Sequence, residues 1–183
     1  MSARPNLIKA VKQLKLRGIY VFISQPSDYQ AMNKEILLKL TKTNGMRGIY
    51  ATLNKPYNQI KGELEKRGID TGNIFFIDGV SKKKNTPENA GKVFYLSGPE
   101  SLTDLSIAIT VATNTGKYGF LLIDSLSTLL IYNDAHNTQK FAHYLISKMS
   151  SYGMTLAILT LDEDNSTKLL PTLAQFCTKV IRV

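Results

Sequence analysis

Residues 118–130, YGFLLIDSLSTLL, contain the most apolar run of the chain and end it with a carboxylate. The run predicts a buried strand that closes at Asp124, with Ser125 directly after it. A carboxylate at the carboxyl end of a buried strand costs free energy unless something pairs with it. In phosphoryl-transfer proteins the partner is a magnesium ion on nucleotide phosphates; elsewhere such a side chain caps the next segment. Both interpretations of Asp124 stay open on this stretch alone.

The rest of the chain alternates between apolar runs and helical patterns. The apolar runs predict strands at residues 19–24, 48–53, 73–78, 93–97, 118–124, 154–161 and 178–183. Helical periodicity lies between several of them, for example over residues 28–43 and 101–114. The strands are too continuously apolar for either face of the sheet to be exposed to solvent. We therefore expect a mostly parallel sheet with helices on both sides. Ligands of such sheets bind beyond the carboxyl ends of the strands, where the strand order reverses.

The length of 183 residues suggests a single domain over residues 1–183, long enough to bury a sizeable core. Cys177 is the one cysteine, so no intramolecular disulfide can form, and a cytoplasmic location is the simplest expectation. No apolar run approaches the roughly 18–20 residues that span a bilayer, so we expect no membrane span. His136 and His143 could share a helix face, but with one nearby acid and no nearby cysteine we expect no metal site.

The net charge of +9 is concentrated towards the N-terminal end. Residues 1–48 carry +7, residues 49–92 carry +3 and residues 93–183 carry −1. This excess suggests attraction to a polyanion such as nucleic acid, although a lysine-rich solvated surface has the same composition. A basic helix over residues 1–17 is expected to lead into the core. The candidate polyanion contacts are Lys9, Lys12 and Lys15 on that helix and Lys82, Lys83 and Lys84 in a predicted loop.

The order of these elements resembles the RecA-like ATPase superfamily, particularly its KaiC-like and RadA-like members. One matching stretch is Phe120-Leu121-Leu122-Ile123-Asp124-Ser125-Leu126-Ser127, which is similar to the family's Walker B region. Another is GIYATLNKPYNQIKGELEKRGID at residues 48–70, which is similar to the family's second strand and helix. The resemblance covers roughly residues 7–183. It implies a three-layer αβα fold of the P-loop NTPase type, with Asp124 and Ser125 at a nucleotide site.

The sequence departs from that family where a phosphate-binding loop is expected. The family places G-x-x-x-x-G-K-[ST] directly after the first strand, where backbone N–H groups wrap the phosphates and the lysine neutralises them. Counted from the strand end, these positions fall on Gln25, Pro26, Ser27, Asp28, Tyr29, Gln30, Ala31 and Met32. Both glycines, the lysine and the hydroxyl are replaced, and Asp28 would repel a phosphate by roughly 4 kcal/mol at about 4 Å. Lys34 is nearby, but one helical lysine cannot rebuild a glycine-rich loop.

A second departure follows the second predicted strand. KaiC-like proteins have a catalytic glutamate there, and the matching stretch is Thr52-Leu53-Asn54-Lys55, in which Asn54 cannot act as a general base. We therefore expect a non-hydrolysing protein without a cofactor that regulates or scaffolds through a protein partner or further copies of itself. Two alternatives stay open. One is a nucleic-acid-binding accessory protein of the recombinase type; the other is an ATP-binding protein or ATPase with a non-standard phosphate site around Lys34 and Asp124.

Overall fold

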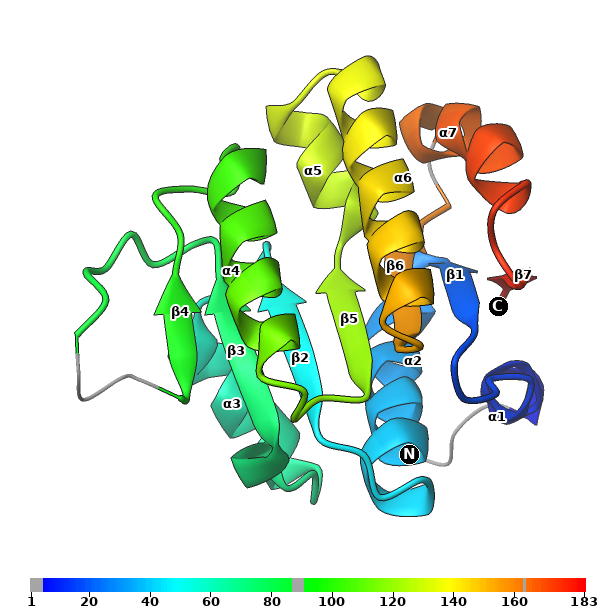
Figure 1. Ribbon diagram of the computed structural model, residues 1–183. Helices are drawn as coiled ribbons and strands as arrows, with labels where there is room; N and C mark the ends of the chain where they lie inside the picture. Colours follow the sequence, from blue (N-terminus) through cyan, green and yellow to red (C-terminus); the bar gives the residue numbers. More distant parts are fainter. Residues whose placement is uncertain (1–4, 87–90, 163) are drawn as a thin grey trace.

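The computed structural model describes residues 5–86, 91–162 and 164–183, and a parallel sheet forms its centre (Figure 1). The strands are β1 (Ile19–Ser24), β2 (Gly48–Thr52), β3 (Ile74–Asp78), β4 (Val93–Tyr95), β5 (Phe120–Asp124), β6 (Thr155–Leu161) and β7 (Lys179–Arg182). The α-helices are α1 (Pro5–Lys12), α2 (Pro26–Leu38), α3 (Tyr57–Lys66), α4 (Leu102–Asn114), α5 (Leu126–Tyr132), α6 (Ala135–Ser151) and α7 (Asp164–Ala174). A π-helical turn, Lys39–Thr43, extends α2, and a 3-10 turn, Thr71–Asn73, precedes β3.

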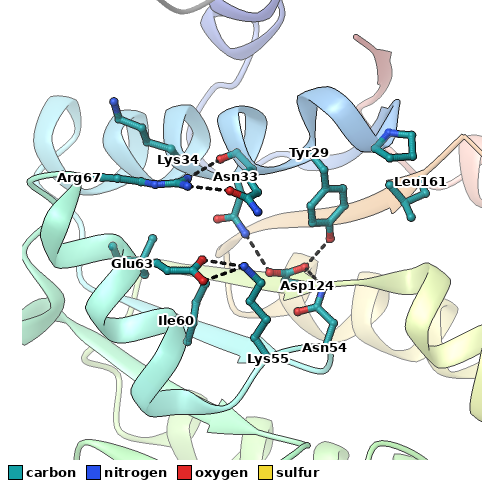
Figure 2. A pocket seen from close by; sticks show the side chains of 13 residues that line it. Tyr29, Asn33, Lys34, Asn54, Lys55, Ile60, Glu63, Arg67, Asp124 and Leu161 are labelled. Atoms are coloured by element: carbon teal, nitrogen blue, oxygen red, sulfur yellow. Dashed lines mark hydrogen bonds and ion pairs between the residues drawn. The ribbon is translucent and has the colours of Figure 1, made fainter. Parts of the chain in front are cut away.

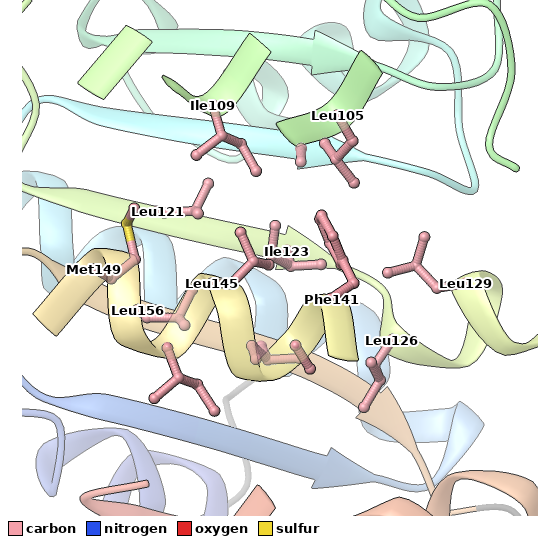
Figure 3. Packing of buried hydrophobic residues seen from close by; sticks show 14 of the residues in the cluster. Leu105, Ile109, Leu121, Ile123, Leu126, Leu129, Phe141, Leu145, Met149 and Leu156 are labelled. Carbon is pink, nitrogen blue, oxygen red and sulfur yellow. The ribbon is translucent and has the colours of Figure 1, made fainter. Parts of the chain in front are cut away.

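The strand order is β4-β3-β2-β5-β6-β1-β7, and each neighbouring pair of described strands is parallel. Helices cover both faces (Figure 1). Leu121 and Ile123 of β5 pack in the cluster under α4 to α7 (Figure 3). Phe120 and Leu122 pack in the cluster that α1, α2 and α3 cover. Because successive strand residues supply opposite faces, both faces of β5 are apolar. The three-layer α/β fold expected from the sequence is confirmed.

The strand register brings the carboxyl ends of the central strands to one edge of the sheet. Thr52 of β2 pairs with Asp78 of β3 on one side and with Asp124 of β5 on the other. β6 separates β5 from β1, and Ser24 at the end of β1 pairs with Leu161 of β6. From there α2 runs back behind the sheet before the chain enters β2 (Figure 1). This crossover places the first turns of α2 next to the end of β5.

The basic helix expected over residues 1–17 is wrong in extent, because α1 ends at Lys12. The first four residues lie outside the described part of the chain. After α1 the backbone bonds to strand residues instead of continuing a helix: the Lys15 N–H donates to the hydroxyl of Tyr20, and the Arg17 N–H donates to Oγ1 of Thr155, each at 2.9 Å. Lys15 is therefore exposed in the segment between α1 and β1 and does not continue the helical face of the other two lysines.

Candidate functional site

Asp124 lies buried at the carboxyl end of β5, and four side chains donate hydrogen bonds to its carboxylate; Figure 2 shows three of them. Oδ1 accepts from the Tyr29 hydroxyl and from Nδ2 of Asn54, the latter at 3.0 Å. Oδ2 accepts from the Tyr50 hydroxyl and from Nδ2 of Asn33, the latter at 2.9 Å. We call these five residues the Asp124 cluster. Both carboxylate oxygens are thus already engaged by donors from this chain.

Three separate segments supply the donors of the Asp124 cluster. Tyr29 and Asn33 are one turn apart on α2, so their side chains share a helix face. Tyr50 lies in β2 two residues before Thr52, which is paired with Asp124 in the sheet. Side chains two apart on a strand share a face, and Tyr50 therefore reaches the α2 side of the sheet. Asn54 is the second residue after the end of β2.

Neutral donors stabilise the buried carboxylate. Asp124 is 2% exposed, and burial raises the pKa of its carboxyl group, against the hydrogen bonds from Tyr29, Tyr50 and Asn54 and the charge of Lys55, which lower it. Burial and the charge of Asp124 also raise the pKa of both tyrosines well above their usual 10. The tyrosines consequently keep their protons and act as donors to Asp124.

We expect the free energy of unfolding of the wild type, relative to Asp124→Asn, to fall as the pH rises above about 4. The pKa of Asp124 is raised in the folded chain, so its protonated form favours folding. This stabilising contribution is fully present when the pH is below the ordinary aspartate pKa of 3.8. It is lost as the pH rises through the pKa of Asp124 in the folded chain. Asparagine carries no charge at any pH and supplies the reference. Urea unfolding of both proteins between about pH 4 and pH 8 measures the difference; a pH-independent difference would contradict the prediction.

The segment expected to correspond to a phosphate loop is helical. β1 ends at Ser24, Gln25 is the one residue between the two elements, and α2 begins at Pro26. The helix predicted to start at residue 28 starts earlier because proline, with its fixed φ and missing N–H, suits the first helical position. Pro26 to Met32 form the first turns of α2, so this junction contains no loop that could wrap a phosphate.

Ser125, and not Asp124, caps the helix that follows β5. Its Oγ accepts from the backbone N–H of Thr128 at 3.2 Å, at the start of α5, a helix that the sequence analysis did not predict. The peptide bond between Asp124 and Ser125 is cis. The carboxylate of Asp124 bonds to side chains of α2, β2 and the segment after β2. The interpretation of Asp124 as a helix cap is therefore wrong.

A pocket of about 230 Å³ opens beside the Asp124 cluster, between α2 and α3 (Figure 2). On its wall, Nζ of Lys55 lies 2.9 and 2.7 Å from the two carboxylate oxygens of Glu63. Although burial opposes the shift, hydrogen bonds from Lys55 and Gln59 lower the pKa of Glu63, so this carboxylate stays charged. At the rim, Arg67 donates to the backbone oxygen and to the side-chain oxygen of Gln30 at 3.0 and 2.8 Å. Lys55, Glu63 and Arg67 thus place two cations and one carboxylate at this pocket, in addition to Asp124 and Lys34.

Lys34 and Asp124, the pair predicted to form a non-standard phosphate site, both line this pocket. Figure 2 shows the Lys34 side chain extending away from Asp124, so the two groups do not converge. Lys55 is the cation whose charge acts on Asp124. A phosphate site built on Lys34 and Asp124 would therefore require Lys34 to reorient.

The residues present do not fit a magnesium–nucleotide complex. A carboxylate binds magnesium when one of its oxygen lone pairs coordinates the ion or accepts a hydrogen bond from a coordinated water molecule. Both oxygens of Asp124 instead accept hydrogen bonds from this chain. The side-chain amide of Asn54 donates a hydrogen bond to the same carboxylate. It is not basic and cannot take a proton from a water molecule. The one-residue junction at Gln25 provides no glycine-rich loop. The arrangement offers hydrogen-bonding and charged groups to a ligand.

The two groups of lysines predicted to contact a polyanion lie at opposite ends of the sheet (Figure 1). Lys9 and Lys12 are exposed on α1, near β1 and β7, whereas Lys82 to Lys84 are exposed in the loop after β3. Nζ of Lys83 lies 5.8 Å from the ring centroid of Tyr95. The two groups do not form one continuous basic surface, and polyanion binding stays a prediction.

Two further features of the chain lie away from this site. His136 and His143 line a separate pocket between α6 and α7, where the ring of His143 meets that of Phe176 edge-on at 4.6 Å. Across residues 5–86, 91–162 and 164–183, no three acidic, histidine or cysteine side chains are grouped closely enough to hold a metal. In the same described residues, no helix has the length and apolar character needed to cross a bilayer.

Asp124, Tyr29 and Asn54 of this site stood out in the sequence, but other residues around them did not. Asn33, Tyr50, Lys55, Glu63 and Arg67 were not predicted as site residues. A weak signal existed for some of them: Arg67, the C-cap residue of α3, lies four residues after Glu63, the same spacing as Tyr29 and Asn33 have on α2. No local pattern shows that these two helix faces border the same pocket.

Comparison with known proteins agrees with this fold. The family model described as the KaiC ATPase matches residues 30–183. Among solved structures, a KaiC-like protein from the hyperthermophilic archaeon Pyrococcus horikoshii superposes with a TM-score of 0.67 at 13% sequence identity, covering 92% of this chain and 72% of that chain. A comparison with curated proteins found no match. At this identity the structural likeness shows the fold alone, which is the RecA-like αβα fold that the sequence analysis expected.

Proposed function

This chain belongs to the KaiC family of ATPases, and we propose that it is a non-hydrolysing member that regulates or scaffolds through contacts with other proteins. The Asp124 cluster carries the proposal. Proteins that transfer phosphoryl groups use an aspartate at such a strand end to hold the magnesium on the nucleotide. Here the four hydrogen bonds from Tyr29, Asn33, Tyr50 and Asn54 occupy the oxygens of that aspartate.

Two independent features support the same proposal. The junction between β1 and α2 is the single residue Gln25. It is too short to form a loop whose backbone N–H groups could surround a phosphate. The position expected for a catalytic base is Asn54, whose amide donates to Asp124 at 3.0 Å. These features lie on different segments of the chain, so no single substitution would restore hydrolysis.

Exposed apolar side chains support the proposed protein contacts. Ile107 and Val111, one turn apart on α4, are 51% and 59% exposed. Ile131 and Tyr132 at the end of α5 are 75% and 53% exposed. Apolar side chains that gather on a surface often mark contact sites for other proteins. The unpaired Cys177 is consistent with the cytoplasmic location that we propose with this function.

We expect isothermal titration of the protein with Mg-ATP to give no saturable heat up to about millimolar nucleotide, and no phosphate release above background. Binding in the micromolar range would overturn the proposal. Asp124→Asn is the matched variant for any binding or turnover that is observed. A signal that it abolishes would show that Asp124 serves a nucleotide after all; a signal that it leaves unchanged would exclude the alternative site built on Lys34 and Asp124.

A further inference from the structure

The pocket beside the Asp124 cluster contains a buried acceptor without a donor. Asn33 is 6% exposed, and its side-chain oxygen accepts no hydrogen bond within the described residues. The orientation of the amide is defined, because its nitrogen donates to Asp124 at 2.9 Å and to the Tyr50 hydroxyl at 2.7 Å. Figure 2 shows the oxygen on the opposite side of this amide, facing the pocket. Since a buried acceptor is unfavourable when unpaired, the site favours a ligand that brings a donor.

The charges around the pocket favour an anion. Three cations, Lys34, Lys55 and Arg67, line it with two carboxylates, those of Glu63 and Asp124. Lys55 and Glu63 form an ion pair. Arg67 uses two donors of its guanidinium group on Gln30, and three of the group's five N–H donors remain. A guanidinium group binds a carboxylate through two parallel hydrogen bonds, and the excess of one cation matches a single negative charge.

The size and lining of the pocket restrict the ligand further. Its volume of about 230 Å³ is below the roughly 300–1,000 Å³ of pockets that hold drug-sized molecules. Ile60 and Leu64 of α3 provide an apolar wall for a short carbon skeleton. The ligand that fits these constraints is small, singly charged and carries a hydrogen-bond donor.

We propose that this pocket binds a small hydroxycarboxylate, with the ligand hydroxyl donating to Oδ1 of Asn33 and its carboxylate accepting from Arg67. The proposal goes beyond the function proposed above, because it assigns a ligand to the protein that is not a nucleotide. The ligand would bridge α2 and α3 next to the Asp124 cluster. Such a bridge would couple occupancy of the pocket to the packing of these two helices.

Titration of the ¹⁵N-labelled protein with glycerate, followed by amide chemical shifts, tests the proposal. We expect saturable shifts at residues of α2 and α3 that line the pocket, with a dissociation constant below about 10 mM. Arg67→Gln should weaken binding about tenfold or more, because it removes the charged partner of the carboxylate. Lys66→Gln is the matched control: it removes the same charge from the neighbouring, exposed residue of α3 and should leave the affinity unchanged.

Propionate provides a second test that needs no variant, because it carries the carboxylate of glycerate without either of its two hydroxyl groups. It should bind about fivefold more weakly than glycerate, since it brings no donor to Asn33. Absence of saturable shifts with glycerate up to about 50 mM would overturn the proposal, as would equal binding of propionate or equal weakening by Lys66→Gln. These results are independent of the Mg-ATP titration, so failure of this inference and failure of the proposed function are distinguishable.

Discussion

Replacing Asp124 by alanine should lower the free energy of unfolding by about 3–5 kcal/mol. The substitution removes the acceptor for four donors, and two of these, the amide of Asn33 and the hydroxyl of Tyr50, are buried. Buried donors cannot turn to bulk water, and each one left unpaired costs about 1–3 kcal/mol. Urea unfolding monitored by circular dichroism measures the loss as a shift of the midpoint at constant slope.

Asp134→Ala is the matched control for this substitution. Asp134 is an exposed residue that accepts from the backbone N–H of Asn137 at the start of α6, so its loss should cost far less than that of Asp124. An aspartate whose main role is to hold a bound magnesium would give the opposite pattern, with little effect on the stability of the free protein. A loss for Asp124→Ala no larger than that for Asp134→Ala would therefore contradict the structural role of Asp124.

Replacing Gly48 by alanine should lower the free energy of unfolding by about 3 kcal/mol. Gly48 pairs with Phe120 across β2 and β5, and the aromatic ring lies over the glycine. A Cβ atom at this position would lie 1.9 Å from Cζ of Phe120, far inside van der Waals contact. Phe120 is completely buried in the cluster on the α2 side, so its ring cannot move away without displacing its neighbours. Thermal or urea unfolding measures the loss.

Gly62→Ala provides the comparison for Gly48→Ala, because it makes the same chemical change within α3. Apart from its chain neighbours and the backbone of α3, no atom of the described residues lies within 4 Å of a Cβ built at Gly62. Alanine there should raise the free energy of unfolding by about 0.5–1 kcal/mol, since glycine in the interior of a helix loses more backbone entropy on folding. Effects of the same sign and size for the two variants would show that the contact between Gly48 and Phe120 is not tight.

The alternation of apolar and helical patterns was sufficient to predict the sheet and its helical layers. Each of these signals is local: a continuous apolar run needs cover on both faces, whatever the rest of the chain does. The predicted ends of helices and strands were less accurate where contacts with residues far along the chain determine them. α1 ends at Lys12 because the following backbone bonds to residues of β1 and β6, and the latter bond joins Arg17 to Thr155. Sequence patterns near residue 17 contain no information about residue 155.

Asp124 stood out in the sequence because a carboxylate that closes a buried strand needs a partner. The nature of the partner followed from the packing of α2 against the sheet. Tyr29, Asn33, Tyr50 and Asn54 lie 95, 91, 74 and 70 residues before Asp124 in the chain, and the strand order brings them together. Apolar periodicity is a property of neighbouring residues and can be read locally. Hydrogen-bond partners at such separations depend on the positions of whole elements, and these are defined only once the chain has folded.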